Sequence, residues 1–157
     1  MIFAVDTNIL LDILIPNTAH VESFISYLMS IGVDNELIIS DVVYAELGSQ
    51  FLSSRDLNSF LLNTSIRVVP SNENSLFEAS TAWKKYSERK KDVIDCPACG
   101  KRQKVTCDFC KEIIAYRQHI LSDFLIGAHA KIHADKFITR DRGFYRTYFH
   151  DLNILTP

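Results

Sequence analysis

The 157-residue chain has no long apolar run, few glycines and prolines, no internal repeat and no low-complexity tract. A composition without repeats or biased tracts argues against a fibrous or disordered protein. The longest apolar stretches are interrupted by polar residues such as Asp12, so none is long enough to span a membrane. No basic leader precedes the first apolar run, which ends at Asp6, so we expect a cytoplasmic protein and not a secreted one.

What is present is the composition of one globular domain, with 47% hydrophobic residues and enough length for a sizeable core. The net charge of −2 is unevenly distributed. Residues 84–111 hold nine Lys or Arg and four Asp or Glu, a local charge of +5, and the rest of the chain carries −7. This division suits an enzyme that binds a polyanion with one surface and a cation with another, although a solvated helix explains residues 84–91 equally well.

Short apolar runs alternate with helical patterns along the chain. Buried strands are predicted at residues 2–5, 37–39, 66–69 and 136–139, with an edge strand at 153–155. Apolar residues at helical spacing predict helices over residues 8–14, 18–32, 41–51, 55–62, 75–89 and 117–133. Strands separated by helices are typical of a parallel sheet covered on both faces, so we predict a three-layer α/β domain.

Four acidic residues lie at the ends of these strands or on the neighbouring helices. Asp6 and Asp141 follow the first and fourth strands, Glu46 lies on the helix after the second, and Asp123 on the helix before the fourth. Because parallel strands end at a common edge of the sheet, we expect the four side chains to converge there. Crowded carboxylates repel one another unless a cation lies between them, and an all-oxygen site suits Mg²⁺ or Mn²⁺. The pattern therefore indicates metal-assisted phosphodiester hydrolysis.

Taken alone, most of these acids have a simpler interpretation. Asp6 is a good helix N-cap, Glu46 a surface residue, and Asp141 a turn residue with arginine neighbours as ion-pair partners. Asp123 is different, because the small residues that follow it indicate a buried helix, where an unpaired carboxylate is costly and a ligand role is favoured. Surface or capping roles are preferred to ligand roles for the nearby histidines, which are His119, His129 and His133.

All four cysteines lie in one segment, as two C-x2-C pairs separated by seven residues: Cys96, Cys99, Cys107 and Cys110. This spacing predicts a closed site of four thiolates for structural Zn²⁺. Two disulfides or a rubredoxin-like iron site are the alternatives, and disulfides are disfavoured in a reducing cytoplasm. We predict a zinc-ribbon insertion at 88–115, stabilised by its metal, within a domain of residues 1–157. Basic residues between the pairs are candidates for contacts with substrate phosphates, or are solvated: Lys101, Arg102 and Lys104.

The chain resembles the PIN-domain nucleases, and especially the VapC-like toxins of prokaryotic toxin–antitoxin pairs. The resemblance rests on Asp6-Thr7-Asn8, the helix bearing Glu46, and residues 122–130 and 139–144, and it covers nearly the whole chain apart from the insertion. It implies a four- or five-stranded parallel sheet flanked by helices, and RNA cleavage with Mg²⁺ or Mn²⁺. By the same resemblance the metal-site carboxylates would be Asp6, Glu46, Asp123 and Asp141, with Thr7, Asn8 and Thr139 as supporting polar groups.

We therefore expect a hydrolase of the metal-dependent endoribonuclease type, acting first of all as the toxin of a type II toxin–antitoxin system. In this chemistry one or two cations lower the pKa of a bound water, which attacks phosphorus. The resemblance also implies a small antitoxin partner and a homodimer. The cysteine segment departs from the minimal toxin pattern and keeps RNA maturation, such as ribosomal RNA processing, as an alternative. A non-catalytic zinc-ribbon module that binds nucleic acid is the alternative from another class.

Overall fold

The computed structural model describes residues 1–15, 21–88, 93–95, 101–114 and 120–156. A five-stranded, wholly parallel sheet forms its centre, in the order β3-β2-β1-β6-β7. The prediction of a four- or five-stranded parallel sheet is confirmed, including its short edge strand. The strands are β1 (Ile2–Val5), β2 (Glu36–Ser40), β3 (Ile66–Val69), β6 (Lys136–Ile138) and β7 (Ile154–Leu155).

The strand order changes direction at the centre of the sheet. From β1 the chain proceeds outwards through β2 to β3, and it then returns to place β6 on the other side of β1, with β7 beyond it. Val5 at the end of β1 is in register with Ile138 at the end of β6. In open α/β sheets, ligands bind outside the carboxyl ends of the strands at such a switch point. The topology therefore identifies the ends of β1 and β6 as the place to look for a site.

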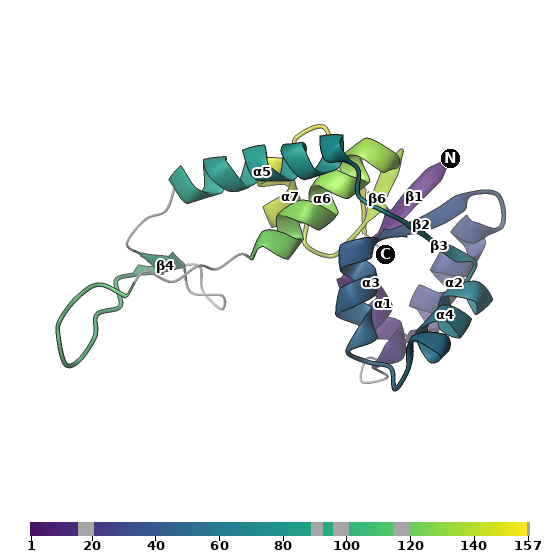
Figure 1. Ribbon diagram of the computed structural model, residues 1–157, viewed down its shortest axis with the longest axis horizontal. Coiled ribbons are helices and arrows are strands. Elements are labelled where there is room, and N and C mark those ends of the chain that lie inside the picture. The colour runs from purple at the N-terminus through teal and green to yellow at the C-terminus, as the bar shows by residue number, and fades with distance from the viewer. Residues whose placement is uncertain (16–20, 89–92, 96–100, 115–119, 157) are drawn as a thin grey trace.

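Helices cover the sheet on both sides (Figure 1): α5, α6 and α7 gather on one side, and α2 and α4 lie on the other. Serine side chains cap the N-termini of two helices. Ser40 Oγ accepts a hydrogen bond from the Val43 N–H (3.1 Å) at the start of α3, and Ser53 Oγ accepts one from the Asp56 N–H (3.3 Å) at the start of α4. The helices are α1 (Thr7–Leu14), α2 (Val21–Gly32), α3 (Asp41–Gly48), α4 (Ser54–Asn63), α5 (Glu73–Glu88), α6 (Leu121–His133) and α7 (Arg142–Tyr148).

Two helices need comment against the sequence-based expectation. Helix α6 begins at Leu121, where the Asp123 carboxylate accepts a hydrogen bond from the Ile120 N–H (3.3 Å), and the predicted start near residue 117 lies outside the described residues. Helix α7 was not predicted at all. It begins after Asp141, whose Oδ1 accepts a hydrogen bond from the Phe144 N–H (3.1 Å). Two of the four candidate acids thus also satisfy backbone groups at helix N-termini.

Close packing of α6 agrees with its small residues. A Cβ atom at Gly127 would lie 2.6 Å from Phe149 Cε2, so only glycine allows this approach. Ala128 and Ala130 are buried on the same helix. Phe124, near the start of α6, packs edge-on against Trp83 of α5 and against the aromatic rings of α7. These contacts fix α6 and α7 relative to the central sheet.

The segment between α5 and α6 contains a second, two-stranded antiparallel sheet of β4 (Ile94–Asp95) and β5 (Arg102–Gln103). Figure 1 shows this ribbon beyond the end of α5, away from the five-stranded sheet. Cys96 and Cys99 lie outside the described residues, whereas Cys107 and Cys110 lie within them. Within the described part of the chain, no helix has both the length and the apolar character needed to cross a membrane.

Candidate active site

The candidate site lies where β1 and β6 end. Asp6 directly follows β1 and Thr139 directly follows β6, and the Asp6 N–H donates to the Ile138 carbonyl at 3.0 Å. This bond continues the ladder between the two strands by one residue. The side chains of Asp6 and Thr139 are 4% and 0% exposed. The sheet itself therefore holds these two groups in place at the switch point.

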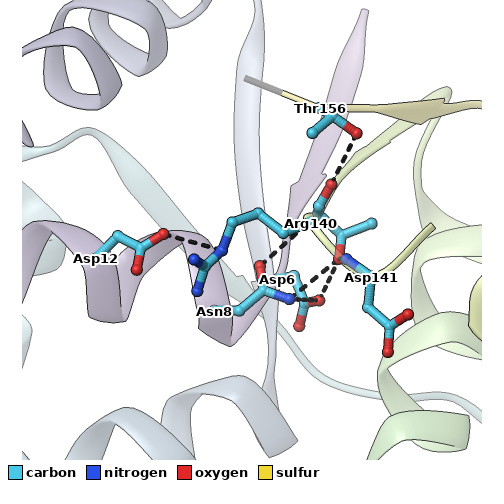
Figure 2. A network of polar contacts seen from close by, with 7 residues as sticks. Asp6, Asn8, Asp12, Arg140, Asp141 and Thr156 are labelled. Atoms are coloured by element: carbon cyan, nitrogen blue, oxygen red, sulfur yellow. Dashed lines mark hydrogen bonds and ion pairs between the residues drawn. The ribbon is translucent and has the colours of Figure 1, made fainter. Parts of the chain in front are cut away.

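Oδ2 of Asp6 is the centre of a hydrogen-bond network (Figure 2). It accepts from the Thr139 hydroxyl at 2.5 Å and from the Asn8 side-chain amide at 2.7 Å. Asn8 Nδ2 also lies 3.2 Å from Thr139 Oγ1, which closes the network. Although Asp6 occupies the N-cap position of α1, its side chain makes no capping hydrogen bond. The simple N-cap interpretation of Asp6 is therefore wrong, and Asn8 and Thr139 are its partners.

Glu46 reaches the same region from α3. Its carboxylate accepts a hydrogen bond from the Thr7 hydroxyl at the start of α1. Thr7 is buried and Glu46 is half-buried, so the interpretation of Glu46 as an ordinary surface residue is also wrong. The hydroxyl holds the carboxylate beside the first turn of α1, next to Asp6.

The remaining two acids approach from α6 and from the turn before α7. Asp123 is half-buried, and Asp141 is exposed. The Asp141 N–H donates to Thr139 Oγ1 at 3.0 Å, which ties this turn to the network around Asp6. Arg140 turns away from Asp141 and pairs with Asp12 of α1, with Nε 3.0 Å from Asp12 Oδ2 (Figure 2). The expected turn role of Asp141 is thus present, but Arg140 is not its ion-pair partner.

The four carboxylates share one electrostatic neighbourhood. Burial, together with the charges of Glu46 and Asp123, raises the pKa of Asp6 from 3.8 to about 6, although hydrogen bonds from Thr139 and Thr7 oppose the shift. Burial also raises the pKa of Tyr145 well above its usual range, with additional contributions from all four acids: Asp6, Asp123, Asp141 and Glu46. All four acids therefore act on the Tyr145 hydroxyl, and two of them, Glu46 and Asp123, act on the Asp6 carboxylate.

The donor set fits a hard divalent cation. It consists of carboxylate oxygens, and Asp6 is buried among like charges, which a bound cation would neutralise. Among the described residues, no three His, Cys, Asp or Glu side chains lie close enough together to hold a metal ion as they stand. Mg²⁺ usually keeps several water molecules and binds few carboxylates directly. A partly hydrated ion therefore suits this spacing better than a closed protein cage.

Sequence reasoning missed Tyr145 and placed His129 incorrectly. Tyr145 lies on α7, which had no recognisable sequence signal. His129 is 1% exposed, with Nε2 2.8 Å from the Val69 carbonyl and its ring stacked on that of His133. It is therefore a core residue that joins α6 to β3, and not a surface or capping residue. His119 lies outside the described residues.

Comparisons with known proteins agree with this architecture. The model of the PIN domain family matches residues 3–98, which is more than half of the chain. The protein belongs to the PIN domain family, whose members are generally metal-dependent nucleases. The structure of VapBC2 from Rickettsia felis, bound to a DNA fragment from their promoter, is similar in fold: TM-score 0.62 and 15% identity, covering 99% of this chain and 98% of that chain. No curated protein matches the chain.

Proposed function

We propose that the protein is a divalent-metal-dependent endoribonuclease that hydrolyses RNA phosphodiester bonds at the site around Asp6. The observation that carries the proposal is the buried Asp6 at the switch point of the sheet, with the charges of Glu46 and Asp123 acting on it and the turn of Asp141 joined to it through Thr139. A bound cation would offset the cost of keeping this buried carboxylate ionised among like charges. The proposed ligands of Mg²⁺ or Mn²⁺ are Asp6, Glu46, Asp123 and Asp141.

The roles of the surrounding residues follow from their hydrogen bonds. Asn8 and Thr139 fix the rotation of the Asp6 carboxylate, and Thr7 fixes that of Glu46. Asp141 is the exposed member of the four acids and is therefore the one that a polymeric substrate can reach most directly. A bound Mg²⁺ or Mn²⁺ would lower the pKa of a water and neutralise charge on the scissile phosphate. Ligands held in advance avoid the reorganisation that mobile carboxylates would require.

Substitution of Asp6 and Asp123 by Asn tests the enzyme proposal. We expect the purified double variant to lose RNA cleavage in Mg²⁺ or Mn²⁺, and the wild-type protein to lose it in EDTA. Asp34→Asn is the matched control, because Asp34 is exposed and lies before β2, at the opposite edge of the sheet. Unchanged cleavage by the double variant would show that the activity does not depend on these acids, and the binding-module alternative would then stand.

The biological context that we favour is the toxin of a type II toxin–antitoxin pair, with a small antitoxin and a homodimeric state. Its support is the likeness in fold to VapBC2 of Rickettsia felis. We expect expression of the wild-type chain to arrest bacterial growth, and the Asp6→Asn chain to be tolerated. A chain that cleaves RNA without arresting growth would favour the second candidate, RNA maturation, which the cysteine segment suggests.

We further propose that residues 88–115 form a zinc ribbon within the domain of residues 1–157. The turn around Cys107 supports this, because backbone N–H groups of Cys110 and Phe109 hydrogen-bond to the Cys107 thiol and lower its pKa. Lys111 has a φ of 62° and donates its N–H to the Cys107 carbonyl at 2.9 Å, so the chain folds back directly after Cys110. N–H groups directed at sulfur favour the thiolate, which is the form that binds zinc.

Elemental analysis tests the zinc assignment. We expect one zinc per chain, lost when Cys107 and Cys110 are changed to Ser and equally when Cys96 and Cys99 are changed. The Asp6→Asn variant serves as control and should retain its zinc. Full zinc content in a cysteine variant would contradict the assignment. Contacts of Lys101, Arg102 and Lys104 with RNA phosphates stay a prediction, tested by the salt dependence of binding after their substitution.

A further inference from the structure

The second pair of cysteines lies on a short antiparallel hairpin, residues 105–114, which we call the cysteine hairpin. Its two ends are joined by the Ile114 N–H, which donates to the Val105 carbonyl at 2.8 Å. Closer to the tip, the Cys107 N–H donates to the Glu112 carbonyl at 2.9 Å. Backbone hydrogen bonds therefore align the two arms, and the turn of the hairpin lies between Cys107 and Glu112.

Phe109 lies in this turn with its ring in solvent. It is 97% exposed, more than any other phenylalanine whose side chain the structure describes. The N–H groups of Phe109 and Cys110 hydrogen-bond to the Cys107 thiol, so the backbone that carries the ring is held in place. A ring left in water forgoes the free energy of burial, which a partner that covers it would supply. The turn thus presents an uncovered aromatic surface at a defined place on the hairpin.

The segment that bears Phe109 is cationic. Residues 101–114 contain four Lys or Arg and two Asp or Glu, a local charge of +2. Three lysines of this segment are exposed, and among the residues that the structure describes they have no ion-pair partner: Lys101, Lys104 and Lys111. An exposed ring on a cationic segment fits a partner that is both anionic and aromatic, which is the composition of a nucleic acid.

A protein partner fits this surface less well than a nucleic acid does. The centre of a protein–protein interface is depleted of charged residues, whereas Asp108 and Lys111 lie in the same turn as Phe109 and are exposed. Between the two kinds of nucleic acid, the ring favours a single strand. In a duplex each base is covered by its neighbours in the stack, so an aromatic side chain stacks on bases that are unpaired.

The cysteine hairpin is also connected to the candidate active site. Phe109 precedes Asp123, in the first turn of α6, by 14 residues, which limits the separation of their Cα atoms to about 50 Å. Figure 1 shows the ribbon beyond the end of α5 and the start of α6, and this is the end of α6 that carries Asp123. A polymer that occupies the acidic site can therefore also reach the hairpin.

We propose that Phe109 stacks on an unpaired base of single-stranded RNA, while the exposed lysines of the same segment bind phosphates: Lys101, Lys104 and Lys111. The inference rests on the RNA cleavage of the proposed function and deepens it, because it assigns unpaired RNA as the substrate class. Stacking is open to every base, so the hairpin adds affinity for a single strand without selecting its sequence. The cysteine segment then serves to hold the turn that displays the ring.

Phe109→Ala tests the proposal in the full chain. Binding is measured by fluorescence anisotropy with a labelled single-stranded RNA and with the duplex of the same sequence, without added Mg²⁺ or Mn²⁺ so that the RNA stays intact. Loss of one base stack corresponds to about tenfold weaker binding of the single strand, and duplex binding should not change. The salt dependence should also stay unchanged, whereas Lys104→Gln should reduce its slope by about 0.7.

Phe77→Ala is the matched control, because Phe77 is 75% exposed on α5, outside the cysteine segment, and should bind RNA as the wild type does. Phe109→Leu keeps an apolar side chain without the aromatic face and decides the matter if Phe109→Ala loses zinc. Equal single-strand affinity of Phe109→Leu and the wild type would overturn the proposal and favour a protein partner, and an equal loss for the duplex would also overturn it. Binding that depends on Phe109, by a wild-type chain that cleaves no RNA, would instead refute the nuclease proposal, so the two failures are distinguishable.

Discussion

Substitution of Gly127 by Ala is the sharpest steric test of how the core supports the site. The added Cβ would lie 2.6 Å and 2.8 Å from two carbons of the Phe149 ring and 2.9 Å from Tyr145 Cε1. Contacts this short force neighbouring atoms to move. Phe149 and Tyr145 are both buried within the aromatic core, so neither ring can swing into solvent. The helix or both rings must therefore shift.

The expected magnitude follows from two opposing effects. Overpacking of a core costs about 1–3 kcal/mol, and two rings in conflict with one methyl group argue for the upper end of this range. Replacing a helical glycine by alanine returns about 1 kcal/mol of helix propensity. We therefore expect Gly127→Ala to lower the free energy of unfolding by about 2 kcal/mol. At about 2–4 °C per kcal/mol for a chain of this size, Tm should fall by about 4–8 °C.

Gly48→Ala provides the matched control. Gly48 ends α3, and a Cβ atom there would meet nothing within 4 Å. We expect this variant to be as stable as the wild type or slightly more stable, because only the helix propensity changes. Urea unfolding and thermal unfolding of the three proteins in EDTA measure the difference. A Gly127→Ala protein as stable as Gly48→Ala would refute the packing described for Phe149 and Tyr145.

Three further predictions concern charge and hydrogen bonding at and near the site. The folded-state pKa of Asp6 is raised to about 6, so ionisation of Asp6 lowers the stability of the fold as pH rises from 3.8 through 6, by at most about 3 kcal/mol. Asp6→Asn should therefore stabilise the metal-free protein at pH 7.5 but not at pH 4. A variant less stable than the wild type in urea unfolding at pH 7.5 would contradict this. Thr7→Val should lower kcat about 10-fold or more by releasing Glu46, whereas Thr7→Ser should retain activity; equal rates for the two would argue against the role of the hydroxyl. Burial lowers the pKa of His129, so NMR titration should find its pKa below 6.5, with Nε2–H donated to the Val69 carbonyl in the neutral form; a pKa at or above 6.5 would be inconsistent with this environment.

The sheet was predictable because its strands are short, apolar and separated by helices of clear period. Even the edge strand at Ile154–Leu155 was found, since its apolar pair follows the last turn signals. The switch point then follows from topology, and with it the position of Asp6 and Thr139. These are properties of local pattern and connectivity, which a sequence carries directly.

The features that were missed depend on tertiary contacts. Helix α7 is short and aromatic, and its start depends on the Asp141 side chain, which as a sequence looked like part of a turn. His129 was wrongly placed because its partner, the Val69 carbonyl, is 60 residues away in the chain. Tyr145 carried no signal, since its position depends on Gly127 and on the Phe137 ring. The sequence, with the resemblance, therefore identified the acids and the polar groups beside them, Thr7, Asn8 and Thr139, but not the aromatic and histidine residues of the surrounding core.

The ion pair of Arg140 shows how the fold keeps the acidic cluster available. Arg140 lies between Thr139 and Asp141, so sequence proximity alone offers its guanidinium to the acids of the site. Instead, Arg140 Nε lies 3.0 Å from Oδ2 of Asp12, a residue of α1 that is 9% exposed. The backbone N–H of Arg140 donates to Asn8 Oδ1 at 3.3 Å. An arginine paired with a site carboxylate would neutralise the charge that attracts a cation. Because Arg140 pairs with Asp12, it does not neutralise the negative charge beside Asp6, as the proposed cation site requires.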